Sequence, residues 1–417
     1  MARITTPLCL LLFLLFIHNS FQQPLSNVDL GALQTIKNSL TDLPGSDFFS
    51  TWDFSSTDPC NTFSGIICSL DDNVTPPLLR IDTLTLGTGL ADSPGLTGSL
   101  TPSLSNLDAL TQLILYSGIA SGPIPSELGN LKNLRVISLT NNRLSGPIPT
   151  TLATLPNLHT LDLSGNQLSG SIPAGLAGLT ELRVLILASN SLSGELPDVT
   201  TQLLHLDLKQ NNFSGRLPSL PSSLRYFSVS QNQMWGPLDA LDPLSELVYL
   251  DLSMNQFNGS IPESLFHYRL SSMLLQRNNL SGGIPRAVSV DVTSYGEGSV
   301  VDLSHNFLSG ELSSVLAGVE SVFLNNNHLM GIVPEDYARS VYEGNMKTLY
   351  LQHNFFSGFP LDSGLSLPDS VSLCLSYNCM VPPVGLTACP ASAGDQLWRP
   401  AYQCSVYNNG TTVEGEP

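Results

Sequence analysis

Aromatic, imidazole and charged side chains recur at three fixed positions of a repeating pattern in this chain, and these residue types suit partner binding. The first position carries His205, Tyr226 and Tyr249 in three consecutive repeats. The second carries Asp207, Asp251, Asp302, Phe323 and Tyr350, and the third carries Arg277, His305 and His353. Exposed tyrosine and arginine are enriched at the energetic centres of protein interfaces. Together the three positions predict a surface that binds a protein or a peptide.

A packing role is the alternative for these residues, because aromatic side chains favour β-strands in general. Rings on adjacent strands can stack on one another or on a ligand. The outward residues of a repeat sheet have no role in the core, so we favour binding.

Motifs for catalysis are not found in the sequence. There is no Gly-x-Ser-x-Gly elbow and no Gly-Lys-Ser/Thr phosphate loop. His305 and His353 share one repeat position but lie two repeats apart. Two strand spacings of about 4.8 Å separate these histidines by nearly 10 Å. That is too far for both to bind one metal ion, whose ligands lie at about 2 Å. We expect no enzymatic activity, no metal and no cofactor.

The elements that position these residues are set by an internal repeat with a mean period of about 24 residues. Its pattern is Leu-x-Leu-x-x-Asn-x-Leu-Ser-Gly-x-Ile-Pro, as in Leu161 to Pro173. The asparagine position holds Asn142, Asn166, Asn190, Asn211, Asn232, Asn255, Asn278, Asn306, Asn327, Asn354 and Asn378. About twelve repeats follow one another.

The spacing of the repeat has a physical cause. In Leu-x-Leu the two leucines of a short strand point to the core, while the intervening residues point to solvent. The asparagine amide can bond the backbone of neighbouring turns and form a ladder. Glycine permits the turn, and proline keeps the returning segment extended. We therefore expect short extended or 3-10 segments on the convex side, with few regular helices.

The composition limits the classes of partner. The chain has 417 residues, with 16 Lys or Arg against 34 Asp or Glu and a net charge of -18. A nucleic-acid binder would need a surplus of basic residues, and a disordered chain would need less apolar content than the 42% found here. The acidic balance favours a basic or uncharged partner and argues against an acidic polysaccharide as the direct ligand.

Residues 1–20 predict a secretory signal peptide. Arg3 precedes the apolar run Leu8 to Ile17, which is about half of the length needed to cross a bilayer. No later stretch is long enough for a membrane span. Five sequons agree with export: Asn73, Asn212, Asn258, Asn279 and Asn409. We expect a secreted protein of the extracellular space or cell wall that has no membrane span of its own.

Six cysteines remain after the predicted signal cleavage. Cys60 and Cys68 lie near the start, and Cys374, Cys379, Cys389 and Cys404 lie near the end. An even number in an exported chain favours disulfides, and neither group has zinc-ligand spacing. We expect Cys60 to pair with Cys68. At the far end we expect Cys379 with Cys389 and Cys374 with Cys404, one of three possible pairings.

The repeat resembles the plant-specific class of leucine-rich repeat proteins, and the resemblance covers nearly the whole mature chain. Residues 29–68 resemble the amino-terminal cap of that family through Trp52, Asp58 to Cys60 and Cys68, with Phe63 where a second tryptophan is usual. The fold that this implies is an α/β repeat solenoid, a right-handed superhelix with a concave parallel β-sheet. The expected parts are a cap at 21–80, repeats at 81–372, a cysteine-containing cap at 373–404 and a flexible tail at 405–417.

The resemblance implies a binding function of one of two classes. The first is a soluble, receptor-like module that recognises a protein or peptide, or joins a receptor-kinase ectodomain, in signalling or defence. The second is an inhibitor of a cell-wall hydrolase, similar to the polygalacturonase inhibitors; these are usually basic, whereas this chain has a pI near 4.5. Receptors of the family often hold a peptide carboxylate with two arginines, but here Arg277 stands alone. A structural wall protein is a third possibility, and we expect a monomer.

Overall fold

The computed structural model describes residues 23–90, 93–267, 270–285, 295–360, 366–381, 389–394 and 396–408. The predicted signal peptide and the sequon at Asn409 lie outside these residues. Within them, no helix is both long and apolar enough to cross a membrane.

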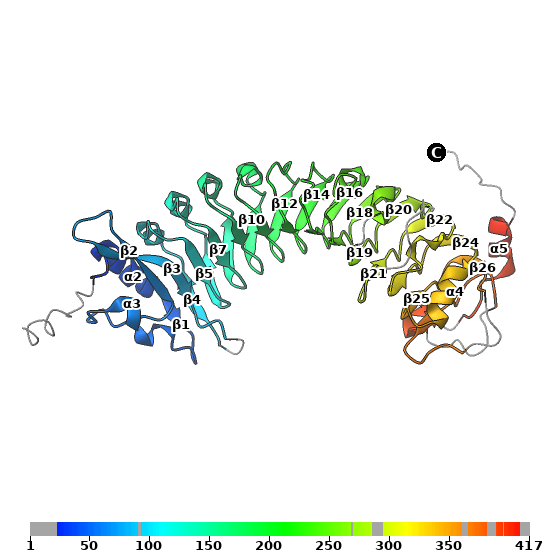
Figure 1. Ribbon diagram of the computed structural model, residues 1–417, viewed down its shortest axis with the longest axis horizontal. Coiled ribbons are helices and arrows are strands. Elements are labelled where there is room, and N and C mark those ends of the chain that lie inside the picture. Colours follow the sequence, from blue (N-terminus) through cyan, green and yellow to red (C-terminus); the bar gives the residue numbers. More distant parts are fainter. Residues whose placement is uncertain are drawn as a thin grey trace, which may run out of the picture.

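The repeats stack into an open arc with one long sheet along its inner side (Figure 1). This concave sheet has 14 strands, parallel except for the antiparallel pair β2 and β3 at its start. Its strands are β2 (Ile66–Asp71), β3 (Leu78–Leu86), β5 (Gln112–Leu115), β7 (Val136–Leu139), β9 (Thr160–Asp162), β11 (Val184–Ile186), β13 (His205–Asp207), β15 (Tyr226–Ser228), β17 (Tyr249–Asp251), β19 (Ser272–Leu274), β21 (Val300–Asp302), β23 (Ser321–Phe323), β25 (Thr348–Tyr350) and β27 (Ser372–Cys374). The predicted solenoid and its concave parallel sheet are confirmed.

A second sheet follows the asparagine of each repeat, where the sequence predicted only an extended turn. We call this 13-stranded sheet the lateral sheet. Its strands are β1 (Leu40–Asp42), β4 (Leu96–Ser99), β6 (Ile119–Gly122), β8 (Arg143–Pro147), β10 (Gln167–Gly170), β12 (Ser191–Gly194), β14 (Asn212–Gly215), β16 (Gln233–Gly236), β18 (Gln256–Gly259), β20 (Asn279–Gly282), β22 (Phe307–Glu311), β24 (His328–Ile332) and β26 (Phe355–Gly358). It forms because the Leu-Ser-Gly segments of successive repeats lie side by side in register.

The convex side holds mostly short 3-10 helices, as expected. They are η2 (Pro102–Asn106), η3 (Ser126–Asn130), η4 (Thr150–Thr154), η5 (Ala174–Gly178), η6 (Asp239–Leu241), η7 (Glu263–Phe266) and η8 (Ser314–Leu316). One regular helix, α4 (Glu335–Tyr342), packs against η8. Tyr337 of α4 is fully buried and donates a hydrogen bond to the carbonyl of Ser313. Residues 335–345, an insertion that lengthens one repeat, therefore lie away from the concave face. Most of a second insertion, 286–299, lies outside the described residues.

The asparagine column joins the two sheets. The Asn255 amide nitrogen donates to the carbonyl of Val229 in the preceding repeat at 2.9 Å and to that of Leu252 at 3.2 Å. Its oxygen accepts the backbone N–H of Met234, on the lateral sheet, at 3.0 Å. The same arrangement recurs at Asn166, Asn211, Asn278, Asn306, Asn327, Asn354 and Asn378. The predicted ladder is thus confirmed.

The amino-terminal cap is built around stacked rings. It contains α2 (Asn27–Ser39), η1 (Phe48–Thr51) and α3 (Pro59–Thr62). Trp52 stacks on Phe63 with centroids 5.4 Å apart, and both are buried. Cys60 pairs with Cys68 as expected. The buried Asp29 carboxylate accepts a bidentate contact from Arg80, so the cap is tied to the first repeat strand by charge as well as packing.

The carboxyl-terminal disulfides are paired differently from the prediction. Cys374 pairs with Cys389 and Cys379 pairs with Cys404. The cause is a bridge between Asn378 and Trp398, reinforced by the Arg399 N–H, which donates to the carbonyl of Asn378 at 2.8 Å. The segment that leads to Cys404 is therefore held beside Cys379.

The cap also extends further than predicted. Helix α5 (Ala401–Asn408) continues past residue 404, so residues 405–408 are helical and do not belong to a flexible tail. η9 (Ala391–Ala393) completes the described part of this cap.

Candidate binding site on the concave sheet

Three rings form a continuous stack on the concave sheet, and we call them the ring column: His205, Tyr226 and Tyr249. The strand register places them directly opposite one another on β13, β15 and β17. The His205 and Tyr226 rings are 4.0 Å apart with an interplanar angle of 3°. The Tyr226 and Tyr249 rings are 4.4 Å apart at 1°. The sequence predicted this neighbourhood, and the structure shows that the rings are also parallel.

The curvature of the sheet explains the close ring spacing. Adjacent strands lie about 4.8 Å apart at the backbone. Side chains on the inner side of an arc converge toward its centre, so their tips come closer than their backbones. The sequence suggested that these side chains face solvent. All three are instead half-buried, because the rings cover one another's faces.

The ring column is uncharged near neutral pH. Burial lowers the pKa of His205 below its ordinary 6.5, although the carboxylates of Asp207 and Asp162 oppose this change. Burial also raises the pKa of Tyr226 far above its ordinary value, and the nearby Asp207 carboxylate adds to the rise. The pKa of Tyr249 is raised mainly by burial. The column therefore offers ring surfaces and hydroxyl groups instead of net charge.

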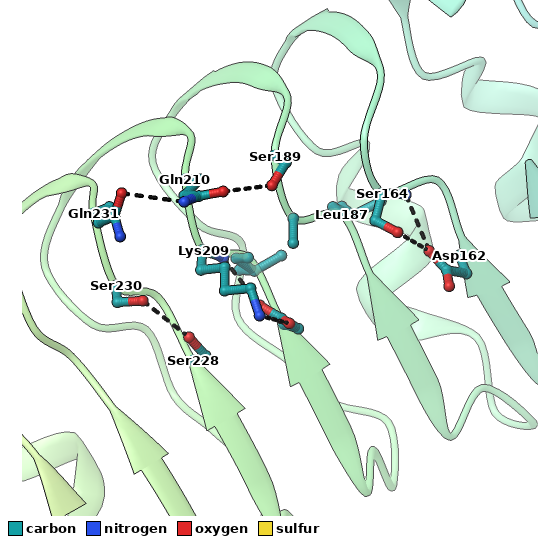
Figure 2. Close-up of polar contacts among 12 residues, drawn as sticks. Asp162, Ser164, Leu187, Ser189, Lys209, Gln210, Ser228, Ser230 and Gln231 are labelled. Atoms are coloured by element: carbon teal, nitrogen blue, oxygen red, sulfur yellow. Dashed lines mark hydrogen bonds and ion pairs between the residues drawn. The ribbon is translucent and has the colours of Figure 1, made fainter. Parts of the chain in front are cut away.

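The aspartates of the second position have a structural task that the sequence did not reveal. Oδ1 of Asp251 accepts hydrogen bonds from the Ser253 backbone N–H at 3.0 Å and from its hydroxyl at 2.7 Å. Figure 2 shows the equivalent contact between Asp162 and Ser164. Asp207 and Asp251 are nearly buried. One oxygen of such a carboxylate closes the turn after the strand, and the other can face the concave surface.

The remaining members of the second position vary in charge and contact. Lys209 makes a 3.2 Å ion pair with Asp207. Burial raises the pKa of Asp302, an effect opposed by hydrogen bonds from Ser304. Phe323 and Tyr350 pack edge to face with centroids 5.3 Å apart. β19 and β21 separate this pair from the ring column, so the structure does not bring all the predicted rings together.

The third position forms a row along the edge of the concave sheet where the strands end. Every non-glycine residue in it has a left-handed backbone, from Asn141 (φ 52°) to Tyr377 (φ 56°). Residues other than glycine rarely adopt this backbone conformation, and each one in it costs about 1 kcal/mol or more of stability. Ser189, Gln210 and Gln231 are linked by hydrogen bonds along the row, as Figure 2 shows.

Farther along the row the predicted residues differ in accessibility. Met254, Arg277 and His305 are exposed. His353 instead contacts the carbonyl of Ala393 at 2.9 Å and belongs to the carboxyl-terminal cap. Arg277 and His305 thus extend the concave surface, whereas His353 is used for packing.

Sequence reasoning missed a second group of rings, which lies on the lateral sheet. Phe307, His328 and Phe355 follow one another on β22, β24 and β26, with centroids about 6 Å apart. The Arg399 guanidinium lies 4.0 Å from the Phe355 ring centroid. The signal was present, because each ring directly follows the repeat asparagine.

The sequons lie away from the concave strands. Asn212, Asn258 and Asn279 are exposed on the lateral strands β14, β18 and β20, and the exposed Asn73 lies in the amino-terminal cap. Asn258 and Asn279 are opposite one another in the register. Attached glycans would thus project from the lateral sheet and leave the ring column open.

The described residues offer no alternative site with obvious chemistry. They contain no group of three or more His, Cys, Asp or Glu side chains that could hold a metal. A polar cavity of about 560 Å³ lies beside α4. Its rim includes the 3.0 Å ion pair between Lys347 and Glu320, and it is separate from the ring column.

Comparison with known proteins agrees with this architecture. Residues 26–69 match the leucine rich repeat N-terminal domain, and residues 130–192, 202–224 and 246–268 match leucine rich repeats. No curated protein sequence matches the chain significantly. The stacked repeats and these matches define a solenoid of leucine-rich repeats. These domains and the solved structures below support a plant-type leucine-rich repeat protein.

Solved plant structures resemble the chain. The crystal structure of PEPR1-AtPEP1 is 29% identical in sequence, with a TM-score of 0.62. The match covers 79% of this chain and 49% of the PEPR1-AtPEP1 chain. The LRR ectodomain of the membrane receptor kinase GASSHO1/SCHENGEN3 from Arabidopsis thaliana, in complex with CASPARIAN STRIP INTEGRITY FACTOR 2, is 27% identical with a TM-score of 0.56, over 79% and 44%. A plant ice-binding protein is 26% identical with a TM-score of 0.55, over 80% and 97%.

The chain spans about half the length of the receptor structures that it matches. Its three disulfides and its similarity to a receptor ectodomain support an extracellular protein.

Proposed function

We propose that this protein is a secreted binding module that recognises an extracellular protein or peptide on its concave face and acts in signalling or defence. The observation that carries the proposal is the ring column, three parallel rings held at stacking distance on consecutive strands. Their inner neighbours Leu206, Phe227 and Leu250 already fill the core. The rings are therefore not needed for the fold, and they are the residue types that dominate interface energies.

Two further features support the same face. The third position keeps side chains such as Met254 and Arg277 in a left-handed backbone where glycine would be less strained. The sequons in the described residues lie off the concave strands, so glycans there would not obstruct a partner. The receptor kinase GASSHO1/SCHENGEN3, a structural relative, has been solved in complex with CASPARIAN STRIP INTEGRITY FACTOR 2.

A regular lattice ligand is less well matched by this surface. Ice would call for the same side chain in successive repeats on a flat face. The first position instead runs Val184, His205, Tyr226, Tyr249 and Ser272. Such variation suits one partner with its own sequence of groups.

Replacement of the two tyrosines tests the proposal. Mature wild-type protein and Tyr226→Ala/Tyr249→Ala are used for affinity capture from plant extracellular fluid and plasma-membrane extract, followed by mass spectrometry. The matched control is Trp235→Ala/Phe307→Ala, which removes two exposed rings from the lateral sheet. We expect the concave variant alone to lose a partner, by about 1 kcal/mol of binding free energy or more.

The captured partner separates the functional classes. A receptor-kinase ectodomain or a peptide supports the receptor-like role, and a wall-degrading hydrolase supports an inhibitor. Retention of the same partners by wild type and concave variant, or of none by either, would refute binding through the ring column and favour a structural role.

A further inference from the structure

The ring column ends with Tyr249 on β17, and this last ring has one face without a ring neighbour among the described residues. Tyr249 stacks on Tyr226 with one face. On its other side the register partner is Ser272, a short, half-buried side chain, and the next residue in the same row is Val300 on β21. A gap of one side chain therefore follows Tyr249.

The width of this gap suits one planar group. Tyr249 and Val300 are two strand spacings apart, which is about 10 Å at the backbone. The rings of this row are spaced at 4.0 and 4.4 Å. One further planar group at such a spacing would lie above Ser272 and still leave room for the Val300 methyl groups.

Carboxylates flank the gap. On the neighbouring row, Asp251 and Asp302 lie on either side of the half-buried Leu274. The Asp251 hydrogen bonds identified above both go to Oδ1, so Oδ2 can accept a bond from a ligand. The floor of the gap is thus small and neutral, one wall is an aromatic face, and the row along one side carries two carboxylates.

Two cations of the protein act on this row of carboxylates. Lys209 is engaged with Asp207 on β13, three strands away from β19. Arg277 follows β19 at the exposed edge row, from which its charge acts on Asp302 and His305. Burial and Arg277 lower the pKa of His305, which is therefore neutral near pH 7.

We propose that the gap above Ser272, between Tyr249 and Val300, binds the guanidinium group of an arginine side chain of the partner. This assignment rests on the proposed function of the concave face. A guanidinium group is planar, stacks on aromatic faces and donates in-plane hydrogen bonds to carboxylates. A lysine ammonium satisfies the charge without the stacking, and a phenyl ring satisfies the stacking without the charge.

Small peptide probes test the assignment directly. The probes are acetyl-Gly-Arg-Gly-amide and its citrulline, lysine and phenylalanine counterparts, titrated into the mature protein and followed by saturation-transfer NMR. Citrulline keeps the shape of arginine and removes its charge. We expect the arginine probe to bind at least tenfold more tightly than each of the other three.

Filling the gap provides the matched variant. Ser272→Tyr places a fourth ring on the column and should abolish binding of the arginine probe, with the melting temperature unchanged or raised because a further stacking contact is added. The control is Ser321→Tyr, in the same row on β23 but beyond Val300. We expect this control to retain probe binding.

The outcomes separate this assignment from the proposed function. Equal binding of the arginine and citrulline probes, preferred binding of the lysine or phenylalanine probe, or unchanged binding by folded Ser272→Tyr overturns the guanidinium site. If Tyr226→Ala/Tyr249→Ala still loses its captured partner in that case, the concave binding function stands without the arginine site. Selective binding of the arginine probe that is lost in Ser272→Tyr supports the guanidinium site.

Discussion

The concave and lateral sheets are built from the same repeats and share one core, yet their outer surfaces differ. On the concave sheet, the outward residues include parallel rings at 4.0 to 4.4 Å and carboxylates that are partly buried. On the lateral sheet they include exposed Phe307 and Trp235 and three exposed sequons. A surface whose rings are preorganised at stacking distance suits recognition.

The asparagine column between the sheets explains how the outer surfaces can vary. Each described asparagine of the ladder uses its amide to satisfy carbonyls at the end of a concave strand and an N–H on a lateral strand. Repeats that have no outward aspartate, such as those of Leu274 and Phe323, keep the same asparagine contacts. The repeat thus provides a constant scaffold, and the outward side chains of both sheets can differ from one repeat to the next.

The largest expected effect comes from the inner side of a concave strand. Phe227 is fully buried next to the outward-facing Tyr226 on β15. Phe227→Ala should lower the free energy of unfolding by about 3 to 5 kcal/mol, because it leaves a cavity in the shared core. Denaturant unfolding measures this, with Tyr226→Ala as the control, for which we expect about 1 kcal/mol or less. A larger loss for Tyr226→Ala would contradict the assigned strand faces.

The next effect concerns the connection between the sheets. Asn255→Ala removes the acceptor of the Met234 N–H and the donor to the Val229 carbonyl. A loss of about 1 to 3 kcal/mol of unfolding free energy should follow, since buried backbone groups lose their partners. Gln256→Ala, at the exposed neighbouring position, is the control and should change stability by less than about 0.5 kcal/mol. Equal effects would mean that the asparagine column does not hold the sheets together.

A smaller effect is expected from acidification of the ring column. The pKa of His205 is lowered in the folded protein by burial, so the folded state binds a proton less readily than the unfolded state. Its contribution to stability is complete above the ordinary pKa of 6.5 and is lost as the pH falls through the lower folded value. The facing charges are Asp162, Asp207 and Lys209.

His205→Phe keeps a ring in the column and removes the titration. Unfolding measured between pH 7.5 and about pH 5 should therefore show a weaker decline for this variant than for wild type. His305 and His328 also have lowered pKa values and contribute equally to both proteins. Parallel pH profiles of wild type and variant would show that the stack tolerates a charged imidazole.

The smallest effect should come from the lateral rings. Phe307 is 52% exposed and lies 5.9 Å from the His328 ring. Phe307→Ala should alter the free energy of unfolding by about 0.5 kcal/mol or less and leave partner capture unchanged. Loss of capture would move the binding surface from the concave to the lateral sheet.

Much of the fold could be predicted from local periodicity. The period-two leucines fixed which side chains of each strand enter the core, and the recurrent asparagine identified the ladder. The cap rings Trp52 and Phe63 were also predictable, because they precede the first repeat and have no other core to join. For the site, the alignment of the repeats was sufficient to place His205, Tyr226 and Tyr249 on neighbouring strands.

Other features depend on contacts between segments that are distant in sequence, and only the tertiary structure decided them. The lateral sheet forms only when the segments after the asparagines of successive repeats lie side by side in register. The Cys379–Cys404 pairing depends on the bridge between Asn378 and Trp398. The parallel ring geometry depends on the curvature of the arc. By itself the sequence determined which residues face outward in each repeat, because that alternation is local. How closely the outward groups approach was set by the stacking of all the repeats into a curved solenoid.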